Sequence, residues 1–309
     1  MSSLRNGVKS AVESALVLGG GAEVSRRKRS RQLLILAYHN IVPADSEPTG
    51  DRSLHLTQRA FAEQLDALVT THEVVSLDAA LIPHRGNAHQ TSRPRVAITF
   101  DDAYAGALTA GVTELRARAL PATIFVTPAF LDGKAFWWDV LSTADSGLDD
   151  AFRERALTEA RGLTDDVLAL AHNSGLSARE MPAHARGAST DQLAAALDFD
   201  GITLAAHTWN HPNLTALADA DLMSELARPL EWLKPYGDRA LPMVSYPYGL
   251  ADRRVMDASH DAGYTAGFMI EGGWTTPDPR DPFAIPRLNV PAGVSRDGFV
   301  LRAAGLIQG

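Results

Sequence analysis

The strongest constraint on the fold is a regular alternation, from Leu33 onward, between short apolar runs and stretches with helical spacing. The runs Leu33–Tyr38 (LLILAY) and Arg95–Phe100 (RVAITF) are apolar along most of their length, which is typical of strands buried on both faces. Over residues 57–72 the apolar residues recur at helical spacing instead, and Thr57 is the expected N-cap. Strands that alternate with helices predict an α/β protein with parallel strands and right-handed crossovers.

The other expected strands are Ala122–Val126, Ile202–Ala206 and residues 243–246, 265–269 and 283–287. The other expected helices cover residues 105–119, 219–234 and 252–262. Residues 132–200 interrupt the alternation, because they separate two strands by far more than the roughly 4–6 residues of a typical connection. Although 309 residues would suffice for about two domains, we interpret this segment as a long helical insertion within one domain, residues 33–309.

Residues 1–32 are interpreted as an amphipathic helix followed by a basic linker. Apolar residues recur every four positions up to the glycines 19–21: Leu4, Val8, Val12 and Leu16. The apolar run 15–18 is too short for the core of an export signal or a membrane span. A basic cluster follows: Arg26, Arg27, Lys28, Arg29 and Arg31. Such a cluster is typical of a solvated linker or of a segment that contacts anionic lipid head groups. We expect a cytoplasmic protein, which under the second interpretation is peripheral to a membrane.

Charge and cysteine content exclude several classes of protein. The chain carries 29 Lys and Arg against 37 Asp and Glu, a formal net charge of −8, which argues against nucleic acid as the main partner. The chain has no cysteine, which excludes a disulfide framework, a thiolate metal site and a cysteine nucleophile. A catalytic metal would therefore need nitrogen and oxygen ligands, and the chain has ten histidines.

Polar and ionisable side chains lie at, or directly after, the ends of several expected strands. These are His39, Asp101 with Asp102, His207 with His211, Tyr248, and Arg287. The carboxyl ends of parallel strands meet at one end of an α/β barrel, where active sites are built. The sequence therefore predicts that these side chains converge on one active site.

The sequence Thr99-Phe100-Asp101-Asp102 places two adjacent carboxylates after a buried strand. Such a pair is unfavourable unless a cation or hydrogen-bond donors compensate the charge. The structural alternative is a helix N-terminus, where backbone N–H groups stabilise acidic side chains. An aspartyl nucleophile of the phosphatase type would need Asp-x-Asp spacing, and residue 103 is alanine.

The segment 207–212 (HTWNHP) carries two histidines four residues apart. On a helical turn both imidazoles would reach one metal ion, but Pro212 disfavours helical geometry at His211 and favours a loop. The alternative is a pair of hydrogen-bonded surface histidines. Together with an aspartate at a neighbouring strand end, the two histidines instead form a set of three ligands that leaves positions for water and substrate.

The motifs TFDD, HTWNHP and YPYG, in this order, resemble those of the polysaccharide deacetylase family (carbohydrate esterase family 4). The similarity extends from Leu33 to about Val290, apart from the insertion. The resemblance implies a distorted (β/α)7-type barrel with a divalent metal, and an enzyme that removes N- or O-acyl groups from sugars.

The resemblance also implies a role for each matching residue. Asp101 matches the catalytic base of the family, and Asp102, His207 and His211 match its metal ligands. The Pro-Tyr-Gly of the third motif implies that the backbone N–H of Tyr248 binds the oxyanion. Zn²⁺ is the metal we expect, although this ligand set also suits Co²⁺, Ni²⁺ or Fe²⁺.

The sequence departs from the family pattern in four motifs. Ala103 stands where the first motif usually has glycine, and Ser245 where the third usually has arginine. The fourth motif has only a loose counterpart in Glu271 and Trp274. No histidine follows His260, so the C-terminal Leu-x-His that supplies the general acid of the family is absent.

Two residues are expected to replace missing groups. Some family members look circularly permuted, with the general-acid histidine on the first strand, and LAYH at 36–39 fits that arrangement with His39 as the acid. Arg287 is expected to tether Asp101 in place of the missing arginine. The alternatives are a hydrogen bond from His39 to a neighbouring loop, and a surface salt bridge of Arg287.

We therefore expect a metal-dependent hydrolase that cleaves a linear amide bond, removing N-acetyl or other acyl groups from amino sugars of a polysaccharide or glycan precursor. The same site would suit a deformylase of a lipid-linked amino sugar or a cyclic amide hydrolase. A different class is a catalytically silent glycan-binding domain, which Ala103 and the missing arginine favour. Trp209 and Tyr248 are candidate walls for the acyl methyl group, while Trp137 and Trp138 either line a sugar subsite or cap the barrel.

Overall fold

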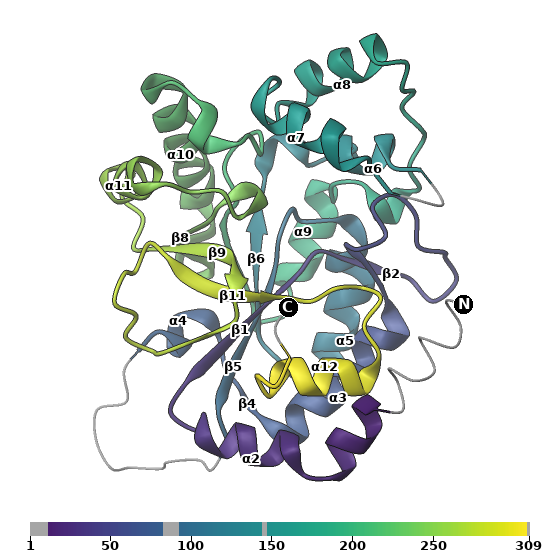
Figure 1. The fold of residues 1–309 in the computed structure, drawn as a ribbon. Coiled ribbons are helices and arrows are strands. Elements are labelled where there is room, and N and C mark those ends of the chain that lie inside the picture. Colours follow the sequence, from purple (N-terminus) through teal and green to yellow (C-terminus); the bar gives the residue numbers. More distant parts are fainter. Residues whose placement is uncertain (1–11, 83–92, 144–146, 308–309) are drawn as a thin grey trace.

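The computed structural model describes residues 12–82, 93–143 and 147–307, which form an α/β barrel (Figure 1). Within these ranges the strands are β1 Leu33–Tyr38, β2 Asn40–Val42, β3 His55–Thr57, β4 Glu73–Val74, β5 Arg95–Phe100, β6 Ala122–Val126, β7 Ile202–Ala206, β8 Ala240–Ser245, β9 Ala266–Gly272, β10 Trp274–Thr275 and β11 Ile285–Asn289. The predicted strands are all present, with shifted boundaries in β8, β9 and β11.

The barrel closes through β1, which pairs in parallel with β5 on one side and with β11 on the other. The closed order is β1-β5-β6-β7-β8-β9-β11, seven parallel strands among the described residues. Strand β4 adds to β5, and β10 pairs antiparallel with the start of β1. All residues of β1, β5 and β6 are buried, as their apolar runs predict. The (β/α)7-type barrel is confirmed.

Helices cover the outside of the barrel. They are α3 Gln58–Thr71, α4 Leu77–Ala80, the π-helix η1 Ala107–Gly111 with α5 Val112–Ala117, α10 Asp219–Leu233, α11 Arg253–Ala262 and α12 Arg296–Ala303. Thr57 caps α3 as predicted, because its side chain accepts a hydrogen bond from the backbone N–H of Ala60.

The segment between β6 and β7 is helical, with α6 Trp137–Leu141, α7 Asp150–Thr158, α8 Thr164–Asn173 and α9 Thr190–Leu197. Figure 1 shows α6, α7 and α8 at the end of the barrel where the parallel strands finish. Helix α9 packs against β7 and η1, so it serves as the crossover helix of the barrel. The added structure is therefore the part that contains α6, α7 and α8.

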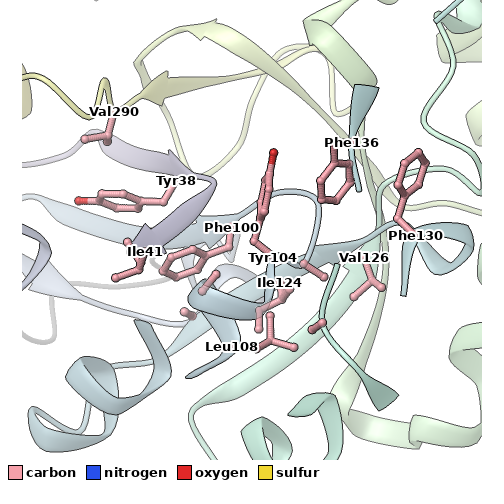
Figure 2. Close-up of a cluster of buried hydrophobic side chains, with 14 of the residues drawn as sticks. Tyr38, Ile41, Phe100, Tyr104, Leu108, Ile124, Val126, Phe130, Phe136 and Val290 are labelled. Atoms are coloured by element: carbon pink, nitrogen blue, oxygen red, sulfur yellow. The ribbon is translucent and has the colours of Figure 1, made fainter. Parts of the chain in front are cut away.

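An aromatic stack joins the start of this insertion to the barrel. Figure 2 shows Tyr104, Phe136 and Phe130 side by side. The ring centroids of Tyr104 and Phe136 are 4.4 Å apart, and Phe130 stacks on Phe136 at 4.7 Å. Because Tyr104 follows β5 and Phe130 follows β6, the stack fixes α6 above two strand ends.

The N-terminal segment is helical over residues 12–18 and again in α2 Gly21–Lys28. Leu4 and Val8 lie outside the described residues. Val12 and Leu16 are exposed, and the same helix instead buries Glu13. The basic cluster lies in the last turn of α2 and the turn that follows, and its contact with lipid stays a prediction. No helix in the described ranges is long and apolar enough to cross a membrane.

Candidate metal centre and active-site pocket

Three predicted ligands come together at the carboxyl ends of β5 and β7. The ligand atoms of Asp102, His207 and His211 all lie within 4.8 Å of one another. Oδ1 of Asp102 is 3.2 Å from Nε2 of His211 and 3.5 Å from Nε2 of His207, and the two Nε2 atoms are 3.1 Å apart. All three residues are buried, so these donors point toward one another within the pocket rather than into open solvent.

The chain turns sharply to deliver these ligands. Asp102, Ala103, Thr208 and His211 have φ values of 71°, 58°, 63° and 57°, the left-handed region that disfavours side chains. Ala103 occupies the position where the family motif usually has glycine, and its φ shows why glycine is usual there. The segment around His207 and His211 is a loop, as Pro212 predicts, and the hydroxyl of Thr208 accepts a hydrogen bond from the backbone N–H of His211.

The donor set fits a divalent cation. Oδ1 of Asp102, the oxygen that faces both imidazoles, is buried and has no hydrogen-bond partner among the described residues. Burial lowers the pKa of His211 to about 3, which keeps its ring neutral and its nitrogen lone pair available. Nδ1 of His207 lies 2.8 Å from the carbonyl oxygen of Ser245, an arrangement that leaves Nε2 free to coordinate. Two imidazoles and one carboxylate are ligands typical of zinc and similar metals.

The adjacent carboxylates have different surroundings. Burial raises the pKa of Asp102 to about 6, although the nearby imidazoles of His207 and His39 oppose this effect. Burial also raises the pKa of Asp101, but Arg287 and His207 outweigh it and hold that pKa well below its usual range. Asp101 is therefore ionised and compensated by the protein itself, whereas Asp102 lacks such a partner.

Arg287 forms a bidentate ion pair with the carboxylate of Asp101. Its Nη1 donates to Oδ1 and its Nη2 to Oδ2 of Asp101, both at 2.7 Å. Nη2 of Arg287 also donates to Oγ of Ser245 at 2.7 Å, and that hydroxyl lies 3.1 Å from Oδ2 of Asp101. The guanidinium is fully buried on β11 and so is not a surface salt bridge. Its contact with Ser245 places the guanidinium beside the residue that stands where the third motif of the family usually has arginine.

Two tryptophans of α6 contact residues around the metal-ligand set. The indole N–H of Trp137 donates to the hydroxyl of Tyr248 at 3.0 Å, and this hydroxyl lies 3.2 Å from the carbonyl oxygen of His211. The ring of Trp138 lies 4.7 Å from that of His211, and its indole N–H donates to the hydroxyl of Tyr104 at 2.8 Å. Tyr248 is held in this way with φ 58° and ψ 5°, at the turn of the Pro-Tyr-Gly motif.

A buried carboxylate that sequence reasoning missed, Asp139, lies on the same helix. Its Oδ2 accepts a hydrogen bond from the hydroxyl of Tyr104 at 2.7 Å. Its Oδ1 lies 2.8 Å from Nε2 of His55 and accepts a hydrogen bond of 2.8 Å from the backbone N–H of Asp51. The signal in the sequence was an acidic residue directly after an apolar aromatic run, which is unfavourable unless donors surround it.

The metal-ligand set lies in a cavity of about 320 Å³, at the lower end of the range for ligand pockets. His39, Asp101, Asp102, His207, His211 and Tyr248 all contribute to its surface. His39 is half-buried at the end of β1, where burial lowers its pKa and the charges of Asp102 and Asp101 partly offset the effect. The pocket also contains Asp51 and Arg153, which the sequence did not single out.

Three aromatic or acidic candidates lie away from the lining of this pocket. Cζ of Arg228 lies over the ring of Trp209, 3.9 Å from the ring centroid. Trp209 does not line the pocket, so its ring is not a wall for the acyl group. Glu271 is exposed on β9. Trp274 lies in β10 beside the start of β1, and its ring neighbours that of His72. The loose counterpart of the fourth motif therefore does not contribute to the described pocket.

Known proteins are similar to this chain in sequence and in fold. A family model described as polysaccharide deacetylase matches residues 88–267, which include the first three motifs but neither His39 nor Arg287. The chain belongs to the polysaccharide deacetylase family. YxkH of Bacillus subtilis (strain 168), whose name describes a polysaccharide deacetylase, is 27% identical over 99 residues, 32% of this chain and 35% of YxkH. The match thus covers about a third of that curated relative.

Solved structures of this deacetylase fold are similar over most of the chain. Deacetylase PplD of Streptococcus pyogenes, in complex with acetate, has a TM-score of 0.58 and 16% identity, covering 88% of this chain and 98% of that one. IcaB from Ammonifex degensii has a TM-score of 0.58 and 18% identity, covering 90% of this chain and 98% of that one. These likenesses establish the barrel and nothing finer, because both identities are low.

Proposed function

We propose that the protein is a metal-dependent deacetylase that hydrolyses the N-acyl amide of amino sugars in a polysaccharide or glycan precursor. The observation that carries this proposal is the juxtaposition, in one pocket, of a metal-ligand set with a separate carboxylate held by Arg287. The two carboxylates thereby have different roles, with Asp102 facing the two imidazoles and Asp101 facing the guanidinium.

A divalent ion held by Asp102, His207 and His211 would polarise the acyl oxygen and acidify a water molecule. Asp101 is the group of this chain that accepts the proton of the attacking water, because it is ionised and lies beside the ligand set. Arg287 and Ser245 orient this carboxylate and still leave oxygen lone pairs for the proton.

Two further groups complete the proposed reaction. The backbone N–H of Tyr248 stabilises the negative charge that develops on the acyl oxygen, a contribution of about 3 kcal/mol for one such donor. His39 donates a proton to the nitrogen of the departing amine. Its position in the same pocket, directly after the first barrel strand, supports this role.

The proposed substrate is an acylated amino sugar, and a substrate panel separates it from the alternatives. Purified protein loaded with Zn²⁺, and in parallel with Co²⁺ or Ni²⁺, is incubated with N-acetylglucosamine oligomers, an N-formyl amino sugar and a cyclic imide. Release of acetate from the oligomers is the expected result. Release of formate alone, or ring opening alone, would assign the site to the alternative reactions. Sugar binding without any turnover would favour a silent glycan-binding domain.

Contact with a membrane surface is a separate proposal about the N-terminal segment. Residues 12–32 carry five basic against two acidic residues in a chain of net charge −8. The same segment exposes Leu16, Val24 and especially Leu18, which is 87% exposed. Basic and apolar side chains together are typical of surfaces that bind anionic lipids. Helix α2 precedes β1 and lies at the end of the barrel opposite α6–α8, so a bound protein would open its pocket away from the bilayer (Figure 1).

Vesicle co-sedimentation tests this contact. We expect salt-sensitive binding to phosphatidylglycerol vesicles and none to phosphatidylcholine vesicles. The double change Arg27→Glu with Lys28→Glu should abolish binding, whereas Arg253→Glu, a charge reversal on exposed α11, should leave it intact. Equal binding by the parent protein and the double variant would rule the lipid contact out.

A further inference from the structure

The pocket contains a second polar centre besides the metal-ligand set. Asp51 lies between β2 and β3, and Arg153 lies on α7 of the insertion. Nη2 of Arg153 is 2.7 Å from Oδ2 of Asp51, and the two side chains are 35% and 13% exposed. Both residues line the pocket that holds Asp101 and Asp102. The insertion therefore brings a guanidinium into the pocket that contains the strand-end carboxylates.

The carboxylate of this pair is held rigidly. Oδ1 of Asp51 accepts hydrogen bonds from the hydroxyl of Ser53 at 2.7 Å and from its backbone N–H at 3.2 Å. The backbone N–H of Asp51 donates to the buried Asp139. Gly50 has φ 70°, and a Cβ there would lie 2.4 Å from a carboxylate oxygen of Asp139, so the approach of this loop requires glycine. Such a preorganised group loses little freedom when it binds a ligand.

The chemistry of the pair suits neutral hydroxyl groups. A guanidinium has five N–H donors, and the side chain of Arg153 uses Nη2 for its hydrogen bond to Asp51. The remaining donors lie beside a carboxylate acceptor, and a sugar hydroxyl both donates and accepts. Because the two charges compensate each other, the pair presents no net charge. Apolar side chains from three parts of the chain line the same cavity: Leu54, Leu157 and Ile270.

We infer that Asp51 and Arg153 form a subsite that binds the hydroxyl groups of a neutral sugar unit in the acylated substrate. The inference rests on the proposed function for its substrate, and it gives the insertion a role in recognition, since α7 supplies the donors and the apolar Leu157 supplies a surface for the ring. The catalytic residues act on the acyl group, while this pair acts on the sugar that carries it. The competing explanation is that the ion pair only fastens the insertion to the barrel.

Paired substrates separate these explanations. Arg153→Met is compared with Arg155→Met, a matched change on the same helix. The guanidinium of Arg155 is exposed and pairs with Glu159. The readouts are kcat and KM for an N-acetylglucosamine trimer and for 4-nitrophenyl acetate, an acyl ester without a sugar. We expect Arg153→Met to lower kcat/KM for the trimer about 10- to 100-fold, mainly through KM, since a lost hydrogen bond weakens binding by such factors.

The ester reports whether the catalytic groups are still in place. It should be hydrolysed by Arg153→Met at the rate of the parent protein, and Arg155→Met should leave both substrates unaffected. Equal losses of trimer and ester activity in Arg153→Met would show a structural role and overturn the subsite. Unchanged trimer kinetics in that variant would also overturn it.

A binding measurement keeps the subsite testable if turnover fails. Asp101→Asn, loaded with metal and lacking the proposed base, is titrated calorimetrically with the trimer, with and without Arg153→Met. Binding that Arg153→Met weakens about tenfold or more supports the subsite even if the parent protein releases no acetate. Binding that is insensitive to Arg153→Met, or no binding of the trimer at all, contradicts the subsite. Failure of the proposed function and failure of the subsite thus give different results.

Discussion

The two halves of the pocket differ in origin and in chemistry. One half stands on the ends of buried parallel strands and carries the metal-ligand set and the proposed base, with Asp101, Asp102 and His207 as examples. The other half comes from the helical insertion between β6 and β7 and contributes Trp138 and Arg153. The strand-end half is fixed by the closed sheet, whereas the insertion lies outside that sheet and reaches the pocket through α6 and α7. We therefore expect the first half to determine the rate of the chemical step and the second to determine which glycan binds.

The largest expected effect is on the strand-end half, in Asp101→Asn. The amide keeps the shape of the side chain but cannot accept the proton of water at neutral pH, so kcat should fall about 10³-fold or more. Metal analysis of the purified variant should show the same metal content as the parent, because Asp101 is not in the ligand set. Parental activity in this variant would remove Asp101 from the mechanism.

His39→Gln tests the other proposed proton transfer. Loss of the donor should slow hydrolysis of amides about 10²-fold, while esters with a good leaving group, which need no protonation, should be affected much less. Hydrolysis of an N-acetylated sugar and of 4-nitrophenyl acetate is measured across pH. If amide hydrolysis keeps the parental rate at every pH, the general acid is another group.

Arg287→Met tests the contact between Arg287 and Asp101 through the pH dependence of kcat/KM. Asp101 must be ionised to act, and Arg287 keeps its pKa low, so the parent should stay active as the pH falls well below neutral. Without the guanidinium, burial raises this pKa, and the acid limb of kcat/KM should move to higher pH, with about tenfold lower activity at neutral pH. Arg287→Lys, which retains a positive charge, should shift the limb less. An acid limb that stays in place in Arg287→Met would contradict the tether.

A further prediction concerns metal affinity and the junction between the halves. Tyr104→Phe removes the hydroxyl that joins Trp138 to Asp139, and Trp138 packs against His211. Because groups behind a ligand fix its orientation, Zn²⁺ affinity should fall about tenfold.

Competition with a chromophoric chelator measures this affinity. The matched change Tyr236→Phe, in a ring that packs against Trp232 outside the pocket, should leave the affinity unchanged. A Tyr104→Phe variant that loses thermal stability yet binds Zn²⁺ with the parental affinity would show that the network only stabilises the fold.

The strand-end half could be predicted from the sequence because its signals are local. Asp102 follows an apolar strand directly, and His207 and His211 follow another, so parallel topology alone brings them together. Arg287 also lies in a predicted strand, and its guanidinium contacts both oxygens of Asp101, while its role as a tether stays a prediction. The roles in catalysis remain predictions for the experiments above.

The ion pair that joins the insertion half to the loop before β3 could not be predicted in the same way. Asp51 and Arg153 are 102 residues apart and belong to a loop and a helix whose relative position no strand register determines.

The apolar spacing of the N-terminal segment does not identify the face of its helix that packs. Val12 and Leu16 are exposed, and Glu13 of the same helix is buried. Periodicity shows that a helix is amphipathic, but the face that packs depends on what the fold places beside it.

Catalysis by the strand-end half depends on a metal held by Asp102, His207 and His211 in the proposed mechanism, and one titration tests this dependence directly. Metal-free protein, prepared by chelation, is titrated with Zn²⁺ while acetate release from N-acetylglucosamine oligomers and the unfolding temperature are recorded together. We expect no acetate without metal, activity that saturates at one equivalent, and a higher unfolding temperature in the loaded protein. Acetate release by the metal-free protein at the same rate, or saturation that persists in His211→Ala, would contradict the proposed metal centre.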